Sequence, residues 1–196
     1  MLLVPRGAPG INMTLLEKAG QNCLPSWDIG FEDVDVDESA LMGEEGGGFR
    51  HLRSTLQYSR ASQAANAVGQ AQHAVDVALA HAREREQFGQ PIGAFQAIQH
   101  MLADMQVRVN QARLALYHLA WLIATGQPCQ LEGAQAKLAA SEAFRDVTTQ
   151  GMQIMASAGY AMESEMQRMW RDAALFTFGE GSNELQRNLI AKEMGL

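Results

Sequence analysis

The residue with the clearest potential for acid–base chemistry is Glu180, which stands between Gly179 and Gly181. It comes shortly after the apolar run Ala173 to Phe176. A carboxylate in apolar surroundings is disfavoured in its charged form, and this property suits a general base that works near pH 7. Flanking glycines allow close approach of backbone and ligand. From spacing alone, the alternative is an ordinary exposed glutamate in a glycine turn between two helices.

The elements that must position Glu180 change character near residue 46. Before it, Trp27, Ile29 and Phe31 alternate with polar residues, and Val34 and Val36 continue this pattern, which predicts a strand with one buried face. Three glycines then mark a joint. After them, helical spacing predicts a bundle of three long helices and one or two short ones, over residues 48–84, 94–125, 130–156, 163–174 and 183–194.

The N-terminal part is too small to fold alone, because two to four strands cannot bury enough apolar surface. Its first residues, Leu2-Leu3-Val4, suggest a strand of a larger sheet. We therefore expect residues 1–46 to be the C-terminal part of an incomplete β-domain and residues 47–196 to form a helical domain. The fold class is mainly α, and the chain is expected to be the C-terminal portion of a longer protein or to lean on another chain.

Composition excludes several classes of function. The 196 residues carry a formal net charge of -7 without a run of Lys or Arg, so nucleic acid is not an expected partner. Cys23 and Cys129 show no metal-ligand spacing and favour a reducing compartment, the cytoplasm, and no metal site. No apolar run approaches the length of a membrane span, and the first residues lack the order of a signal peptide.

Four blocks of sequence, taken together, resemble the C-terminal half of an acyl-CoA dehydrogenase. They occur in the order that this family shows and cover essentially the whole chain: Ile29-Gly30-Phe31 through Gly48-Phe49, Arg83 through Gln99, Gln153 through Tyr160, and Arg171-Asp172 through Glu180-Gly181-Ser182. The resemblance implies the end of a middle β-domain followed by a four-helix-bundle-like domain that binds FAD and acyl-CoA.

The resemblance also implies a reaction and roles for residues. The reaction is α,β-dehydrogenation of an acyl-CoA thioester, with Glu180 as the base for the α-proton. Some relatives place the base one residue before the arginine equivalent to Arg60, where this chain has Ser59, so Glu180 fits the commoner placement. The implied substrate-binding residues are Gln57, Arg60 and Gly181. The implied FAD-binding residues are Arg85, Phe88, Gln96, Gln153, Ala156, Ser157, Ser182 and Glu184.

Arg60 and Arg85 give a geometric argument about assembly. If one helix joins them, their Cα atoms lie about 37 Å apart at 1.5 Å per residue. One flavin site in one subunit can hardly use both, so we expect a homo-oligomer, dimer or tetramer, with FAD at the interface. Arg85 suits a phosphate group because guanidinium forms paired hydrogen bonds. The alternatives are a solvent-facing Arg60 and an Arg85 that interacts with a helix C-terminus.

One loop departs from the family pattern, since Ala156-Ser157 stand where paired glycines are usual. The added Cβ atoms restrict φ, so flavin binding at this loop is expected to be altered. Electron-transfer flavoprotein is the electron acceptor that the family implies. Two alternatives stay open: a catalytically inactive helical partner of a full-length subunit, and an oxidase on the same fold that reduces O₂ directly.

Overall fold

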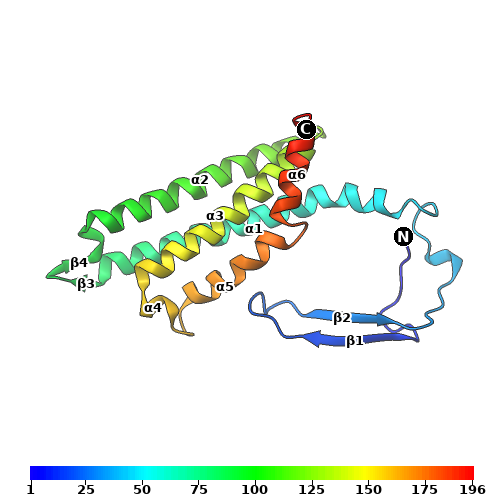
Figure 1. Ribbon diagram of the computed structural model, residues 1–196, viewed down its shortest axis with the longest axis horizontal. Helices are drawn as coiled ribbons and strands as arrows, with labels where there is room; N and C mark the ends of the chain where they lie inside the picture. Colours follow the sequence, from blue (N-terminus) through cyan, green and yellow to red (C-terminus); the bar gives the residue numbers. More distant parts are fainter. The chain divides into compact units, whose positions relative to one another are not determined.

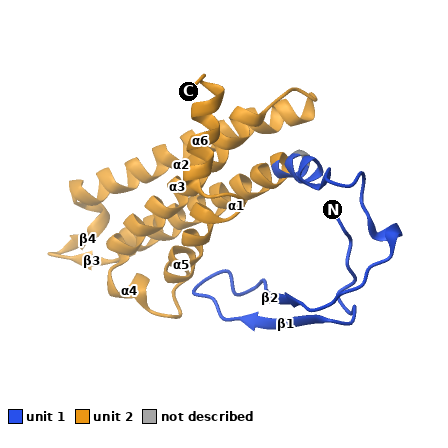
Figure 2. Ribbon diagram, turned by 45° about the vertical axis from the view of Figure 1, so that its right-hand side comes forward, with its two compact units in different colours: residues 1–56 blue, residues 57–196 orange. Residues whose placement is uncertain are grey.

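The computed structural model describes residues 1–53 and 55–196, and it separates into two compact units, Met1–Leu56 and Gln57–Leu196 (Figure 2). The division falls inside the first long helix, α1, which spans Gly48–Glu84. The predicted domain boundary after residue 46 stays a prediction. In the described part of the chain, no helix combines the length and the apolarity needed to cross a membrane.

The first unit contains an antiparallel pair of strands, β1 (Ile11–Leu16) and β2 (Ser26–Phe31), in a register that sets Ile11 opposite Phe31. The short 3-10 helix η1 follows at Glu38–Ala40. A strand is therefore confirmed over residues 27–31, but it ends at Phe31. The expected continuation through Val34 and Val36 is wrong, because Asp33 adopts a positive φ of 47° and turns the chain.

The buried face predicted for β2 is not buried within this chain. Trp27, Ile29 and Phe31 are all exposed, and Phe31 keeps 61% of its surface. A two-stranded sheet has too few neighbours to cover such side chains. The expected strand at Leu2–Val4 is also wrong for this chain, where Leu2 forms only an isolated bridge with Leu41.

The second unit is helical, as predicted (Figure 1). After α1 come the short strands β3 (Glu86–Gln87) and β4 (Gln90–Pro91), the turn η2 (Ile92–Ala94) and the long helices α2 (Gln96–Ala124) and α3 (Gln130–Met155). The one-turn helix α4 (Ser157–Tyr160), α5 (Glu165–Phe178) and α6 (Asn183–Glu193) complete the chain. Helix α5 runs four residues beyond the predicted end at 174, because nothing before Gly179 interrupts its hydrogen bonds.

Small side chains let the helices approach closely. Helix α1 contributes a buried stripe at helical spacing: Ala64, Ala67, Val68, Ala71, Ala74, Val75, Ala78 and Ala82. Helix α3 packs against α2, α5 and α6 and is the centre of the unit. Phe144 of α3 meets Phe176 of α5 edge-on, with ring centroids 5.3 Å apart. This packing fixes the turn between α5 and α6, where Glu180 lies.

Candidate active site

Glu180 occupies a tight turn between α5 and α6. Its φ is +57° and that of Gly181 is +88°, so two consecutive residues adopt the left-handed region. Ser182 then caps α6, because its Oγ accepts a hydrogen bond from Leu185 N at 3.3 Å. The Glu180 side chain is exposed. The apolar surroundings expected from the preceding sequence are therefore not provided by the described residues of this chain.

Arg60 of α1 is buried, with 8% of its surface exposed. Its aliphatic part lies beside Gly133 of α3. Burial lowers the pKa of the Arg60 guanidinium, and the negative charge of Glu180 partly opposes that effect. The two residues singled out from sequence are thus within electrostatic reach of each other, although 120 positions separate them in the chain.

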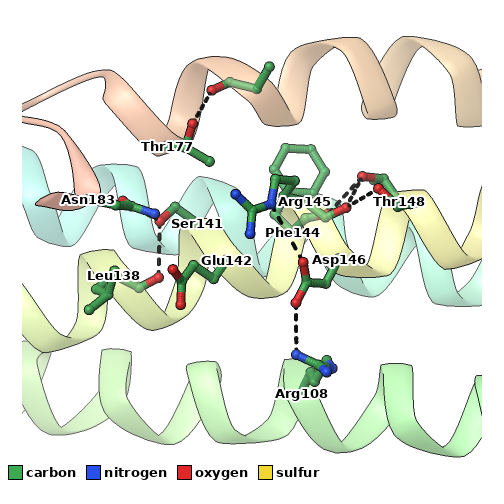
Figure 3. Close-up of polar contacts among 12 residues, drawn as sticks. Arg108, Leu138, Ser141, Glu142, Phe144, Arg145, Asp146, Thr148, Thr177 and Asn183 are labelled. Atoms are coloured by element: carbon green, nitrogen blue, oxygen red, sulfur yellow. Dashed lines mark hydrogen bonds and ion pairs between the residues drawn. The ribbon is translucent and has the colours of Figure 1, made fainter.

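Sequence reasoning missed a second buried cation, Lys137 of α3, which is 1% exposed. Its Nζ donates a hydrogen bond to Asn183 Oδ1 at 2.9 Å, and Ser141 Oγ donates to the same oxygen at 2.9 Å. Figure 3 shows Ser141 and Asn183 facing each other across the two helices. The pKa of Lys137 is lowered to about 8, mainly by burial. The charge of Arg60 also lowers this pKa, whereas the charges of Glu184 and Glu180 partly oppose the change.

A signal for Lys137 exists in the sequence. It falls at helical spacing with residues that are small or apolar, namely Gly133, Ala134, Ala140 and Phe144. A charged residue on the apolar face of a helix is rarely buried without a specific partner. That pattern marks Lys137, while its partner Asn183 follows the Glu180 turn and is recognisable only once the helices are packed.

Unpaired polar atoms surround the turn. Among the described side chains, Arg60 Nε, Gln63 Oε1 and Gln186 Oε1 are buried without a hydrogen-bond partner. Gln186 Nε2 donates to Gly181 O at 3.0 Å, and Gln63 Nε2 lies 2.9 Å from the position that a Cβ on Gly179 would occupy. Native proteins rarely leave such atoms unpaired, and they gather at functional sites.

The remaining predicted residues near Glu180 form the rest of this group, which we call the Glu180 cluster. Gln57 of α1 is half-buried and accepts a contact from Cys129 Sγ at 3.5 Å. Glu184 is exposed in the first turn of α6, where hydrogen bonds to its own backbone and to Ser182 lower its pKa. Gly181 and Ser182 lie in the turn itself. The cluster consists of Gln57, Arg60, Lys137, Glu180, Gly181, Ser182, Asn183 and Glu184.

The other predicted residues lie at the opposite end of the helical unit (Figure 1). Arg85 directly follows α1, Phe88 lies in the β3–β4 turn and Gln96 begins α2. Gln153 and Ala156 lie at the end of α3, and Ser157 begins α4. We call these six the Arg85 cluster. Helix α1 is continuous from Arg60 to Glu84, the residue before Arg85. The Cα atoms of Arg60 and Arg85 are therefore about 37 Å apart, as expected if one helix joins them.

The Arg85 cluster has the chemistry to hold FAD. Arg85 and Gln96 are exposed, and Phe88 is 93% exposed with a positive φ of 54°. The N-terminus of the 29-residue helix α2 has no side-chain cap, which leaves its first backbone N–H groups available to an anion. A diphosphate and an aromatic ring system suit these donors and this ring.

Ala156, like Phe88, has a positive φ, and its ψ is also unusual for a residue with a Cβ. Its φ of 50° and ψ of -130° belong to a region that glycine adopts readily and alanine rarely does. The position where the sequence departs from the paired glycines of the family pattern therefore has a glycine-like backbone. The remaining difference from a glycine is the Cβ of Ala156, which a ligand approaching this loop would meet.

The comparison with known protein families decides the relationship. Residues 46–195 match the model described as acyl-CoA dehydrogenase, C-terminal domain. The chain belongs to the acyl-CoA dehydrogenase family. It is 43% identical over 194 residues to the probable acyl-CoA dehydrogenase YngJ of Bacillus subtilis, covering 98% of this chain and 51% of that protein.

Solved structures of acyl-CoA dehydrogenase relatives agree with the fold. Butyryl-CoA dehydrogenase from Megasphaera elsdenii superposes with a TM-score of 0.95 at 33% identity, over 100% of this chain and 51% of that one. PigA, solved with FAD and proline, gives a TM-score of 0.95 at 28% identity, over 100% of this chain and 51% of PigA. FAD is accordingly the cofactor that the family membership indicates. The chain spans about half the length of the relatives it matches.

Proposed function

We propose that this chain carries the catalytic half of a flavin-dependent acyl-CoA dehydrogenase, with Glu180 as the base that removes the α-proton of an acyl-CoA thioester. The observation that carries the proposal is the Glu180 cluster: a carboxylate on a left-handed turn, within electrostatic reach of the buried cations Arg60 and Lys137. The family membership supports the same assignment.

The proposed reaction follows from the residues of the cluster. The Glu180 carboxylate accepts the α-proton, the β-hydrogen leaves as a hydride, and a double bond forms between the two carbons. Bound FAD supplies the hydride acceptor. The Arg60 cation lies within electrostatic reach of the Glu180 carboxylate and would help to position it. The backbone N–H of Glu180 is suited to stabilise negative charge on the thioester oxygen.

The other site residues take the roles that the sequence suggested. Gln57 and Gly181 contact the acyl-CoA, while Ser182 and Glu184 contact the flavin from the Glu180 end. The Arg85 cluster would bind the flavin of a second copy, which makes the active protein a homo-oligomer, either a dimer or a tetramer. Electron-transfer flavoprotein is the proposed electron acceptor. Cys23 and Cys129 are both free thiols, which supports a cytoplasmic location.

The test uses the purified protein loaded with FAD. We expect a flavin absorbance band at about 450 nm that bleaches when an acyl-CoA is added. Glu180→Gln should retain the band and slow its bleaching by about 10²- to 10⁴-fold. Glu163→Gln, at an exposed carboxylate outside both clusters, is the matched control and should bleach like the wild type.

Three other results of this experiment would contradict the proposed function or favour an alternative. Bleaching of Glu180→Gln at the wild-type rate would overturn the base assignment. A protein that stays colourless with added FAD would favour the inactive helical partner. Peroxide formed in step with substrate consumption would favour the oxidase.

A further inference from the structure

Lys137 is the charged group in this fold that the proposed reaction leaves unused. It projects from the central helix α3 and is almost fully buried. Among the described residues, no carboxylate forms an ion pair with it, and its hydrogen-bond partner is the neutral amide of Asn183. A buried ammonium normally requires compensation, so its position needs a physical reason.

Folding alone does not supply that reason. Asn183 is the first residue of α6, and the N-terminus of a helix carries a partial positive charge that disfavours a nearby cation. Burial and the charge of Arg60 also act against the ammonium, as its lowered pKa indicates. A methionine of similar length would avoid the cost of burying this charge, while Asn183 Oδ1 would keep Ser141 Oγ as a donor.

The hydrogen bonds of Lys137 lead directly to the Glu180 turn. Asn183 Oδ1 accepts hydrogen bonds from Lys137 Nζ and Ser141 Oγ, which both belong to α3. These two contacts attach the start of α6 to α3. One residue earlier, Ser182 caps the helix, and Gln186 holds the carbonyl of Gly181. The left-handed residues Glu180 and Gly181 come next, which means that Lys137 is linked to the turn by a short series of contacts.

The charged groups around Lys137 come from three places. Arg60 belongs to α1, Glu184 to α6, and Glu180 to the turn between α5 and α6. The positive charges of Arg60 and Lys137 together offset the negative charges of Glu180 and Glu184. Removal of one cation changes the electrostatic potential at Glu180, whereas removal of a neutral hydrogen-bond donor does not.

We propose, on the basis of the function proposed above, that Lys137 is a positioning residue for Glu180. Its ammonium fixes the start of α6 through the side chain of Asn183 and, together with Arg60, provides positive potential at the Glu180 carboxylate. The residue does not touch the substrate. It acts through the turn and through its charge.

The first experiment compares Lys137→Met with Ser141→Ala in the FAD-loaded protein. Each change removes a donor to Asn183 Oδ1, and Ser141→Ala also removes the contact of Ser141 Oγ with Leu138 O. Only Lys137→Met removes a charge. For Lys137→Met we expect retained flavin and a rate of flavin reduction by acyl-CoA that is lower by roughly tenfold or more. The low-pH limb of its rate profile should move to higher pH, because a positive charge has been removed from the neighbourhood of the Glu180 turn. Ser141→Ala should change the rate less and leave the limb in place.

The melting temperature separates this effect from damage to the fold. The pKa of Lys137 is about 8 in the folded chain and 10.5 ordinarily, so the cost of burying its charge is present in full below pH 8 and relieved as the pH rises toward 10.5. At pH 7, Lys137→Met is therefore expected to melt no lower than Ser141→Ala. A Lys137→Met protein with the wild-type rate, or with a lower rate and an unmoved limb, would overturn the inference.

A second variant serves if Lys137→Met does not fold. Asn183→Asp keeps the shape and both acceptor contacts but sets a negative charge against the ammonium. We expect a slower rate and the same direction of limb movement; an unchanged rate and limb would count against Lys137. Glu180→Gln is run in parallel. If the flavin in Glu180→Gln is reduced at the wild-type rate, the proposed function is wrong. If Glu180→Gln is inactive but Lys137→Met has the wild-type rate, only the role proposed for Lys137 is wrong.

Discussion

At the scale of single residues, the backbone of Glu180 is as informative as its carboxylate. A residue with a Cβ in the left-handed region costs about 1 kcal/mol or more relative to glycine. The structure has this conformation at Glu180 and again at Gly181, where glycine carries no such cost. A strained residue at a proposed catalytic position suggests that side-chain placement has been favoured over stability.

This strain predicts that Glu180→Gly stabilises the protein while it abolishes flavin reduction. We expect an increase of about 0.5–1 kcal/mol in the free energy of unfolding, or a few degrees in melting temperature. Thermal unfolding followed by circular dichroism measures the change. Glu180→Ala is the control, because it removes the same carboxylate and keeps the Cβ. Equal melting temperatures for the glycine and alanine variants would mean that the backbone carries no strain.

Residue-level prediction from sequence succeeded in part. Glu180 and Arg60 were paired through family resemblance, and the structure brings them into electrostatic reach. Lys137 was missed because a lysine in an alanine-rich helix is usually solvated, and its burial depends on contributions from α1 and α6 that periodicity does not reveal. Glu180 is exposed, as in the alternative that its spacing left open, because the sequence near a residue does not specify which segments cover it.

At the scale of elements, the joint between α3 and α4 concentrates the departure from the family pattern. Helix α3 ends at Met155, and Ala156 reverses the chain with φ +50° and ψ -130°. The sequence suggested that Ala156 restricts this loop, and the observed backbone gives the physical reason. The side chain of Ala156 is exposed, so removal of its Cβ leaves no cavity.

Ala156→Gly is predicted to raise the free energy of unfolding by about 1 kcal/mol, because glycine adopts this backbone without a steric penalty. Differential scanning calorimetry would measure the change, and flavin titration would report whether the loop then binds more tightly. Ala174→Gly is the matched control: Ala174 is exposed within the regular helix α5, where glycine should cost about 1 kcal/mol instead. A loss of stability in both variants would contradict the assignment of strain to Ala156.

Elements were predicted unevenly for a physical reason. The three long helices follow from an apolar period that repeats over many turns, and their bounds agree within a few residues. The N-terminal strands were harder, because six-residue elements offer few repeats and depend on neighbouring strands. Asp33, with its positive φ, ended β2 where the alternation of Val34 and Val36 indicated a continuation.

At the scale of the whole molecule, the two clusters lie at opposite ends of the helical unit, so under the proposed function each chain would contribute to two sites. A FAD bound between copies would take the Glu180 cluster from one chain and the Arg85 cluster from another. This arrangement is a proposal that the distance of about 37 Å along α1 supports. It leads to a test that needs no structure of the assembly.

Co-expression of a Glu180→Gln chain with an Arg85→Ala chain is predicted to restore activity that each lacks alone. In random dimers, about half are mixed and each mixed dimer has one intact site of two, which gives about a quarter of wild-type activity. An acyl-CoA dehydrogenase assay of the unselected mixture measures this recovery. Purification by two different tags then isolates the mixed dimers, which should show about half of wild-type activity. Glu180→Gln paired with Arg60→Ala is the control, since both changes affect the same half-site and leave no intact site. Absence of recovery in the first pair would indicate that each site lies within one copy.

The unbroken helix between Arg60 and Arg85 also limits how this protein can change over evolutionary time. One residue inserted into α1 would advance its far end by about 1.5 Å and rotate it by about 100°, so that Arg85 would face another direction. Substitutions can accumulate along this segment as long as the buried alanine stripe is kept, but the number of residues between Arg60 and Arg85 cannot change. Insertions and deletions among homologues are therefore expected in the connections at 125–129 and 161–164, and the interval from 60 to 85 should keep a constant length.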